Sequence, residues 1–406
     1  MQFSSTFFSG ALLVHIACAA VAPIPPPPGP YGVALQTAEL VNTGMTDPFA
    51  PSKENRRIVV SAFYPTSKSR DCRQSQTPYM PPATAYVYDQ LYGSVGLPNG
   101  TFETLALTLC SPNATMARRK HTPHPVVLFS PGLGNSRLIY NSIAATLAAQ
   151  GFVVLTVDHP YDGAIVEFPD GSFVLAANIT NDEQIQTSLD VRSKDMLYVK
   201  QQLHSHTVTR ELFNGLYGYP DLGKAFLFGH SLGGATAAAA MLEDRKILAG
   251  INLDGTFFGD VIKNDLDRPF MIYAHEGKNL STDQSWADTW SHLRSSKLEV
   301  TVRGSAHGSY TDFPLLLEVL GLRDQLPAEV SESIGAISGT RMLDILSTSI
   351  APFFRFAGCQ NTAEQLKRTL SQVLEMETLN STFVYPHCNS HSSPLKFFGE
   401  AYSSLL

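Results

Sequence analysis

The feature that most constrains this fold is a short apolar strand running directly into the string GHSLGG at 229–234. The small residues at 235–240 that follow it are typical of a helix packed closely on a sheet. A serine between strand and helix occupies a sharp turn, in which the residues two positions away on either side must lack side chains. Gly229 and Gly233 meet that requirement. The segment therefore predicts a nucleophile elbow with Ser231 at its tip.

Strand and helix patterns alternate on both sides of this elbow. Apolar, β-branched runs predict strands at 57–64, 125–129, 152–157, 225–228, 251–253, 270–274 and 298–302. Helical spacing or composition predicts helices at 140–150, 182–203, 232–242 and 283–293. Such alternation builds a mostly parallel sheet covered on both faces by helices. Together with the elbow it predicts the α/β-hydrolase fold, with a mainly helical C-terminal extension.

The domain organisation follows from shifts in composition. We expect a single domain over 57–406, preceded by a proline-rich segment over 21–56 whose prolines form a stiff stretch outside the core. Residues 65–124, rich in Pro, Ser, Thr and Asn, form an insertion, and 323–406 form the C-terminal extension. The net charge of −7 and the lack of a clustered basic face argue against a nucleic-acid partner.

Residues 1–20 have the features of a signal peptide, because an apolar run is followed by small residues suited to cleavage. The run is too short and too rich in small residues for a membrane anchor. Its removal would leave an even number of cysteines, which favours two disulfides, Cys72–Cys110 and Cys359–Cys388, over free thiols. Glycosylation sequons occur at Asn99, Asn113, Asn178, Asn279 and Asn380. These features predict a secreted, extracellular protein.

A serine nucleophile needs a base and a carboxylate that orients it. In this fold the order along the chain is serine, acid, histidine. His307 follows the last predicted strand and is flanked by small residues, so we expect it to be the base rather than an ordinary exposed histidine. Asp254 and Glu276 each follow a strand, and the residue pattern alone leaves both open as the acid. His230 is expected to point away from Ser231.

The tetrahedral intermediate of ester hydrolysis needs two backbone N–H donors. One is expected from Leu232, the residue after the nucleophile. The other is expected from Leu133, in the loop Ser130-Pro131-Gly132-Leu133-Gly134 that follows the strand at 125–129. The alternative is an ordinary turn after a strand. This chemistry requires no metal and no cofactor.

These segments resemble the platelet-activating factor acetylhydrolase family over residues 125–313. The similar segments are FSPGLG at 129–134, the elbow GHSLGG at 229–234, NLDG at 252–255 and GSAH at 304–307. The resemblance implies Asp254 as the acid, Leu133 and Leu232 as oxyanion donors, and hydrolysis of a short acyl ester from a phospholipid. Pro131 departs from the pattern, since the family usually has histidine there.

Two other functions fit the same sequence. A cutinase-like or polyester hydrolase would use the same three residues on the same fold. A non-catalytic secreted binding protein would retain the fold without activity, which the intact Ser231, Asp254 and His307 argue against. The apolar segment 313–322 suits either a core helix or a helix docking on a lipid surface. No feature of the sequence specifies an oligomeric state.

Overall fold

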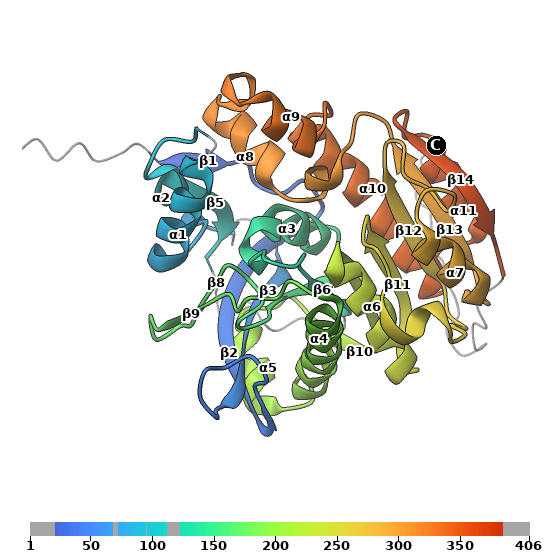
Figure 1. The fold of residues 1–406 in the computed structure, drawn as a ribbon, viewed down its shortest axis with the longest axis horizontal. Coiled ribbons are helices and arrows are strands. Elements are labelled where there is room, and N and C mark those ends of the chain that lie inside the picture. Colours follow the sequence, from blue (N-terminus) through green and yellow to red (C-terminus); the bar gives the residue numbers. More distant parts are fainter. Residues whose placement is uncertain (1–20, 68–71, 95, 112–121, 385–406) are drawn as a thin grey trace, which may run out of the picture.

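The computed structural model describes residues 21–67, 72–94, 96–111 and 122–384. Its centre is a nine-stranded sheet in the order β14-β13-β12-β11-β10-β6-β7-β3-β2 (Figure 1). The strands from β13 to β7 in this order run parallel, while β14, β3 and β2 run antiparallel to their neighbours. Helices cover both faces, so the predicted α/β-hydrolase fold is confirmed.

The elements that build the sheet agree closely with the sequence patterns. The sheet strands are β2 (Gly32–Thr46), β3 (Asn55–Thr66), β6 (Pro123–Ser130), β7 (Val153–Asp158), β10 (Tyr219–His230), β11 (Ile247–Leu253), β12 (Phe270–His275), β13 (Lys297–Val302) and β14 (Met376–Thr382). The helices of eight or more residues are α1 (Pro82–Gly93), α3 (Asn141–Ala149), α4 (Asp182–Gln202), α6 (Leu232–Glu243), α7 (Gln284–His292), α8 (Phe313–Leu320), α10 (Gly339–Ala357) and α11 (Ala363–Leu370).

Shorter elements fill the connections between these. They are the strands β8 (Ile165–Glu167) and β9 (Phe173–Leu175) and the helices α5 (His206–Leu212) and α9 (Ala328–Ile334). Helix α4 begins with a capping box, in which the Asn181 side chain accepts from the Gln184 N–H and the Gln184 side chain accepts in return. Acidic Asp182 and Glu183 in its first turn also favour a helix start there.

Two buried clusters lie on opposite faces of the sheet. One contains side chains of α3, α8, α10 and α11, with aromatic residues such as Phe129, Phe228 and Phe354 at its centre. The other contains side chains of α4, α6 and α7. Helix α6 is rich in glycine and alanine, which lets its backbone lie close to the sheet: a Cβ on Gly234 would meet Asn252 Oδ1 of β11 at 1.9 Å.

Both ends of the sheet differ from the sequence-based boundaries. The domain was expected to begin at residue 57, but β2 forms the edge strand inside the segment 21–56. Its polar C-terminal half is solvent-exposed, as an edge strand allows, and this obscured the strand pattern. The C-terminal extension is helical as expected until β14, which pairs with β13. Helix α8 buries residues 313–317, which makes it a core helix rather than a free lipid-docking surface.

The expected insertion, together with residues 22–24 of the proline-rich segment, forms a small structure against the main sheet. Strands β1 (Ala22–Ile24), β5 (Leu105–Cys110) and β4 (Gln74–Pro78) make a three-stranded sheet, accompanied by α1 and α2 (Thr101–Thr104). The predicted Cys72–Cys110 disulfide is present, and it packs against Gly32 of β2. Cys359 is disulfide-bonded, and its predicted partner Cys388 lies outside the described residues.

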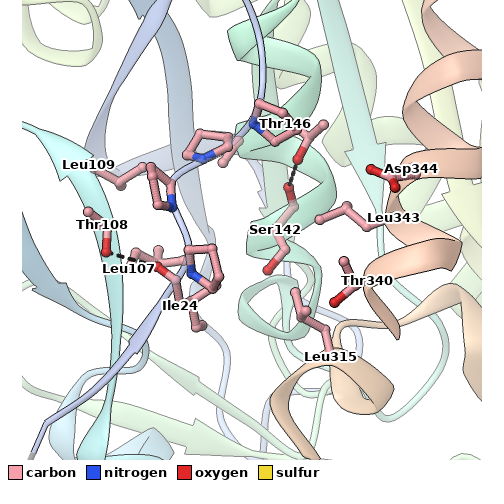
Figure 2. Close-up of a pocket in the computed structure, with 15 residues that line it drawn as sticks. Ile24, Leu107, Thr108, Leu109, Ser142, Thr146, Leu315, Thr340, Leu343 and Asp344 are labelled. Carbon is pink, nitrogen blue, oxygen red and sulfur yellow. Dashed lines mark hydrogen bonds between the residues drawn. The ribbon is translucent and has the colours of Figure 1, made fainter. Parts of the chain in front are cut away.

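An apolar pocket of about 240 Å³ lies between this small sheet and the helices α3, α8 and α10 (Figure 2). The proline segment 25–28, Leu107 and Leu109 line one side, and Leu315 and Leu343 line the other. None of the predicted catalytic residues lines this pocket. Across the described ranges, no helix combines the length and apolarity needed to cross a bilayer.

Candidate active site

Ser231 sits in the sharp turn between β10 and α6 that the sequence predicted. Its backbone has φ 54° and ψ −126°, a conformation that is rare for a residue with a side chain. A Cβ on Gly229 would lie 2.2 Å from the Gly233 carbonyl oxygen, and one on Gly233 would lie 2.0 Å from the Ser130 carbonyl oxygen. Both positions therefore require glycine, and the turn holds the Ser231 side chain above the sheet's edge.

Asp254 and His307 form a hydrogen-bonded pair at the same edge. Nδ1 of His307 lies 2.6 Å from Oδ2 of Asp254, whose carboxylate is buried while the imidazole is half-exposed. A carboxylate oxygen only accepts, so Nδ1 carries the proton, and in the neutral ring Nε2 is left as the basic atom. The Ser231 N–H donates to the carbonyl of Leu253 at 2.9 Å, which fixes the serine directly beside the acid's strand.

A second histidine contacts the same carboxylate. Nδ1 of His275 lies 2.8 Å from both oxygens of Asp254, and its backbone N–H donates to Oδ1. The Lys278 ammonium lies 3.8 Å from Oδ1. Burial alone would raise the pKa of Asp254, but the hydrogen bonds from His275 and His307 and the charge of Lys278 outweigh it and lower the pKa well below its usual range. The carboxylate is therefore charged at neutral pH.

The sheet order explains why these residues meet. Strands β6, β10, β11, β12 and β13 are consecutive neighbours, and all are parallel. Their carboxyl ends share one edge, so the residues that follow them gather there, as expected for ligand sites of open α/β sheets. The loops after these strands carry, in the same order, Leu133, Ser231, Asp254, His275 at its strand's last position, and His307.

The loop at 130–134, called the oxyanion loop below, is fixed on several sides. A Cβ on Gly132 would lie 3.3 Å from the Ser231 Cβ, so the loop backbone lies against the serine. Gly134 donates to the carbonyl of Asp162 and accepts from the N–H of Ala164. Within the described residues, the N–H groups of Leu133 and Leu232 donate to no acceptor. Free donors on both sides of a serine can stabilise an oxyanion.

A buried ion pair between Arg192 and Asp162 holds the backbone of the oxyanion loop in place. The Arg192 guanidinium of α4 pairs with the Asp162 carboxylate and also donates to the carbonyl oxygens of Pro131, at 2.6 Å, and Gly132, at 3.3 Å. Both charged side chains are almost fully buried. Because Pro131 has no N–H, its contribution to the loop is this carbonyl, which faces inward to the arginine rather than toward the serine.

The other predicted residues are placed as follows. Glu276 accepts from the Gly304 N–H at 2.9 Å and is exposed, so it supports the turn before His307 and makes no contact with that imidazole. Asn99 and Asn178 are exposed, and Asn279 is half-buried. Asn380 lies in β14, where its amide donates to Glu299 at 2.6 Å. Asn113 lies outside the described residues.

Sequence reasoning missed three contributors to the site: His275, Arg192 and Tyr140. His275 is the last residue of β12, and its contact with Asp254 arises because β12 pairs with the neighbouring strand that leads to Asp254. Arg192 contacts the oxyanion loop from a distant helix, and Tyr140 accepts from the Gly132 N–H. Both contacts involve backbone atoms, for which the sequence carries no pattern. Among the described residues, no group of three or more His, Cys, Asp or Glu side chains could hold a metal ion.

The family model described as platelet-activating factor acetylhydrolase, isoform II, matches residues 22–212 and 199–333. A probable 1-alkyl-2-acetylglycerophosphocholine esterase of Arthroderma benhamiae is 28% identical over 354 residues, which is 82% of this chain and 88% of the relative. A platelet-activating factor acetylhydrolase of Bos taurus is 25% identical over 311 residues, 69% of each chain.

Among solved structures, a ferulic acid esterase from Streptomyces cinnamoneus is similar over most of the fold. The TM-score is 0.73 at 27% sequence identity, covering 88% of this chain and 99% of that one. The residues matched by the family model extend well beyond the elbow and include the strands that lead to each predicted site residue.

Proposed function

The chain belongs to the platelet-activating factor acetylhydrolase isoform II family, and on that premise we propose that it releases a short acyl group from a glycerophosphocholine lipid through an acyl-serine at Ser231. The chain is a carboxylic ester hydrolase, as its esterase relatives and structural neighbour indicate. The observation that carries the proposed mechanism is the Asp254–His307 pair beside a serine flanked by two free N–H donors.

In the proposed acylation step, Nε2 of His307 takes the proton from Ser231 Oγ as that oxygen bonds to the ester carbonyl carbon. The carbonyl oxygen becomes an oxyanion and accepts from the N–H groups of Leu133 and Leu232. Asp254 stabilises the imidazolium. The bond to the lipid's glycerol oxygen then breaks, and the alcohol leaves with the proton from His307.

Deacylation repeats these steps with water. Nε2 of His307 takes a proton from a water molecule as the water oxygen attacks the acyl carbon. His307 then returns this proton to Ser231 Oγ as the bond between that oxygen and the acyl carbon breaks and the carboxylic acid leaves. The half-exposed imidazole leaves the site accessible from solvent, which suits a substrate whose alcohol part is large. Secretion is part of the proposal and is supported by the Cys72–Cys110 disulfide, since such bonds persist in oxidising compartments.

The test combines labelling and turnover. A fluorophosphonate should label Ser231 in the wild type and not in Ser231→Ala, and that variant should lose turnover by about 10⁴–10⁶-fold. Both proteins should be assayed on acetyl, butyryl and long-chain esters, with and without a phosphocholine headgroup. Retained esterase activity in Ser231→Ala would contradict the nucleophile assignment. Equal rates with and without phosphocholine would contradict the lipid substrate.

Hydrolysis of a hydroxycinnamate ester is the second candidate. It is favoured by the ferulic acid esterase, whose chain is covered to 99% by this fold. Methyl ferulate added to the same panel separates the two, because its acyl group is a rigid aromatic acid rather than acetate. A higher kcat/KM on methyl ferulate than on the acetyl phospholipid would favour this second function.

A further inference from the structure

A buried chain of hydrogen bonds connects the oxyanion loop to the His307 loop. The Gly132 N–H donates to Tyr140 Oη at 3.2 Å, and the Asn135 amide donates to the same oxygen at 3.1 Å. Tyr140 Oη lies 2.8 Å from Nδ1 of His230, and Nε2 of His230 lies 3.0 Å from the carbonyl oxygen of His307. Each end of the chain is thus a backbone atom of a loop that carries a proposed catalytic group.

The direction of every bond in this chain is determined. The His307 carbonyl can only accept, so Nε2 of His230 carries a proton. Burial, assisted by the neighbouring His307, lowers the pKa of His230 to about 3, so the ring is neutral and Nδ1 must accept. Tyr140 therefore donates its O–H to Nδ1, and its oxygen accepts from Gly132 and Asn135. Burial also raises the pKa of Tyr140, which keeps that proton in place.

Both side chains lie deep in the protein, where a hydrogen bond has few alternatives. Tyr140 is fully buried and His230 is 2% exposed, so water cannot replace a lost partner without entering the core. The two rings also contact Phe129 and Tyr310. Apolar side chains of similar size could fill this space, so packing alone gives no reason for polar atoms that end on two functional loops.

We propose that Tyr140 and His230 are positioning residues whose one-directional hydrogen-bond chain fixes the oxyanion loop relative to the His307 loop. This inference rests on the proposed function. By occupying the Gly132 N–H, Tyr140 leaves Leu133 as the loop's free donor. By holding the His307 carbonyl, His230 fixes the backbone from which the base extends. A displacement of about 1 Å at such groups can reduce the rate about 100-fold.

The chain is tested by Tyr140→Phe, which removes only the hydroxyl, and by His230→Gln, which retains an N–H that can reach the His307 carbonyl. Tyr64→Phe is the matched control, because Tyr64 is also buried and its hydroxyl donates to a backbone carbonyl, that of Asn214, at 2.6 Å. Each variant is measured for melting temperature, fluorophosphonate stoichiometry, and kcat and KM on p-nitrophenyl acetate.

We expect Tyr140→Phe to lower kcat about 10–100-fold, with KM changed by less than about threefold, because the groups that bind the ground state remain. Tyr64→Phe should show a comparable loss of melting temperature with an unchanged kcat. The double variant Tyr140→Phe/His230→Gln should lose little more than Tyr140→Phe alone, since residues acting as one unit are not additive. Rates are normalised to labelled Ser231, so partial unfolding does not imitate the effect.

The outcomes separate this inference from the proposed function. If the wild type is labelled at Ser231 but Tyr140→Phe and Tyr64→Phe have equal kcat values, the positioning role is wrong and the proposed function stands. If the wild type is not labelled at Ser231, the proposed function fails first. Should Tyr140→Phe fail to fold, His230→Phe, which keeps a ring but removes both nitrogens and so breaks the same chain, would overturn the inference by showing a normal kcat.

Discussion

Nδ1 of His275 lies 2.8 Å from both carboxylate oxygens of Asp254, the carboxylate that also accepts from His307. Asp254 is thus held between two imidazoles, of which only that of His307 is proposed to exchange protons with the substrate. The remaining contacts of the carboxylate come from the His275 N–H and from Lys278. Its orientation therefore depends on a residue outside the proposed triad.

Replacing His275 should weaken the proposed triad without removing any member of it. We expect His275→Asn to lower kcat by about tenfold, because Asp254 loses one of the groups that fix its orientation. His292→Asn is the control, since His292 also contacts an aspartate, Asp265, at 2.8 Å but on the surface. Steady-state kinetics on p-nitrophenyl acetate checks this, and equal kcat values for the two variants would refute it.

Replacing each of the two candidate acids by its amide should have different effects on kcat. Asp254→Asn should reduce kcat by about 10³–10⁴-fold, because the amide cannot stabilise the imidazolium and disturbs its tautomer. Glu276→Gln should stay within about threefold of the wild type, since the amide oxygen can still accept from the Gly304 N–H. Turnover of an acetyl ester measures both. A large loss in Glu276→Gln alone would move the acid to the later strand.

Because the oxyanion loop lies against Ser231, adding a side chain at Gly132 should reduce the activity. A Cβ there would meet the Asn135 amide at 3.1 Å and His230 Nδ1 and Ser231 Cβ at 3.3 Å. Gly132→Ala should therefore lower kcat by about 10–100-fold through displacement of the loop. Gly93→Ala is the control, because a Cβ at that position meets nothing within 4 Å. Comparable activity of the two variants would place the oxyanion donor elsewhere.

Asp312 predicts a pH dependence of stability. It is fully buried, and burial raises its pKa to about 7 against the opposing hydrogen bonds from Ser142 and Tyr79. Between about pH 4 and 7 the folded protein keeps a proton that the unfolded chain has lost, so the unfolding free energy falls as the pH rises through this window, by up to about 1.4 kcal/mol per unit.

The side chain introduced by Asp312→Asn cannot ionise, so this variant should lack the fall in unfolding free energy that Asp312 causes as the pH rises. Its unfolding free energy relative to the wild type should therefore increase as the pH is raised from about 4 to about 8. Denaturant unfolding at several pH values measures the difference. A constant difference across that range would show that Asp312 ionises in the folded protein as readily as in the unfolded chain.

The Cys72–Cys110 disulfide should contribute to stability but not to chemistry. It closes a segment of 38 residues in sequence, and removing such a cross-link costs about 3–4 kcal/mol in the chain-entropy model. The double variant Cys72→Ala/Cys110→Ala should unfold at lower denaturant concentration with kcat unchanged below its transition. A fall in kcat for the folded variant would instead connect the insertion to the site.

The sequence alone determined the fold class, the elbow and the edge of the sheet near which Ser231, Asp254 and His307 lie. It could do so because these depend on local patterns: glycines that a tight turn requires, and strands alternating with helices whose carboxyl ends share one edge. The resemblance then favoured Asp254 over Glu276 as the acid. In the structure Asp254 contacts His307, whereas Glu276 accepts from the Gly304 N–H.

Tertiary structure alone decided what holds that site in place. The contacts of His275 with Asp254, of Arg192 with the oxyanion loop, and of Tyr140 with His230 join residues 21 to 90 positions apart. No local pattern encodes such pairs, because a side chain's partner depends on how strands pair and helices pack. The edge strand β2 was missed for a related reason, since its polar, exposed C-terminal half carries no strand pattern and is held in the sheet by pairing with β3.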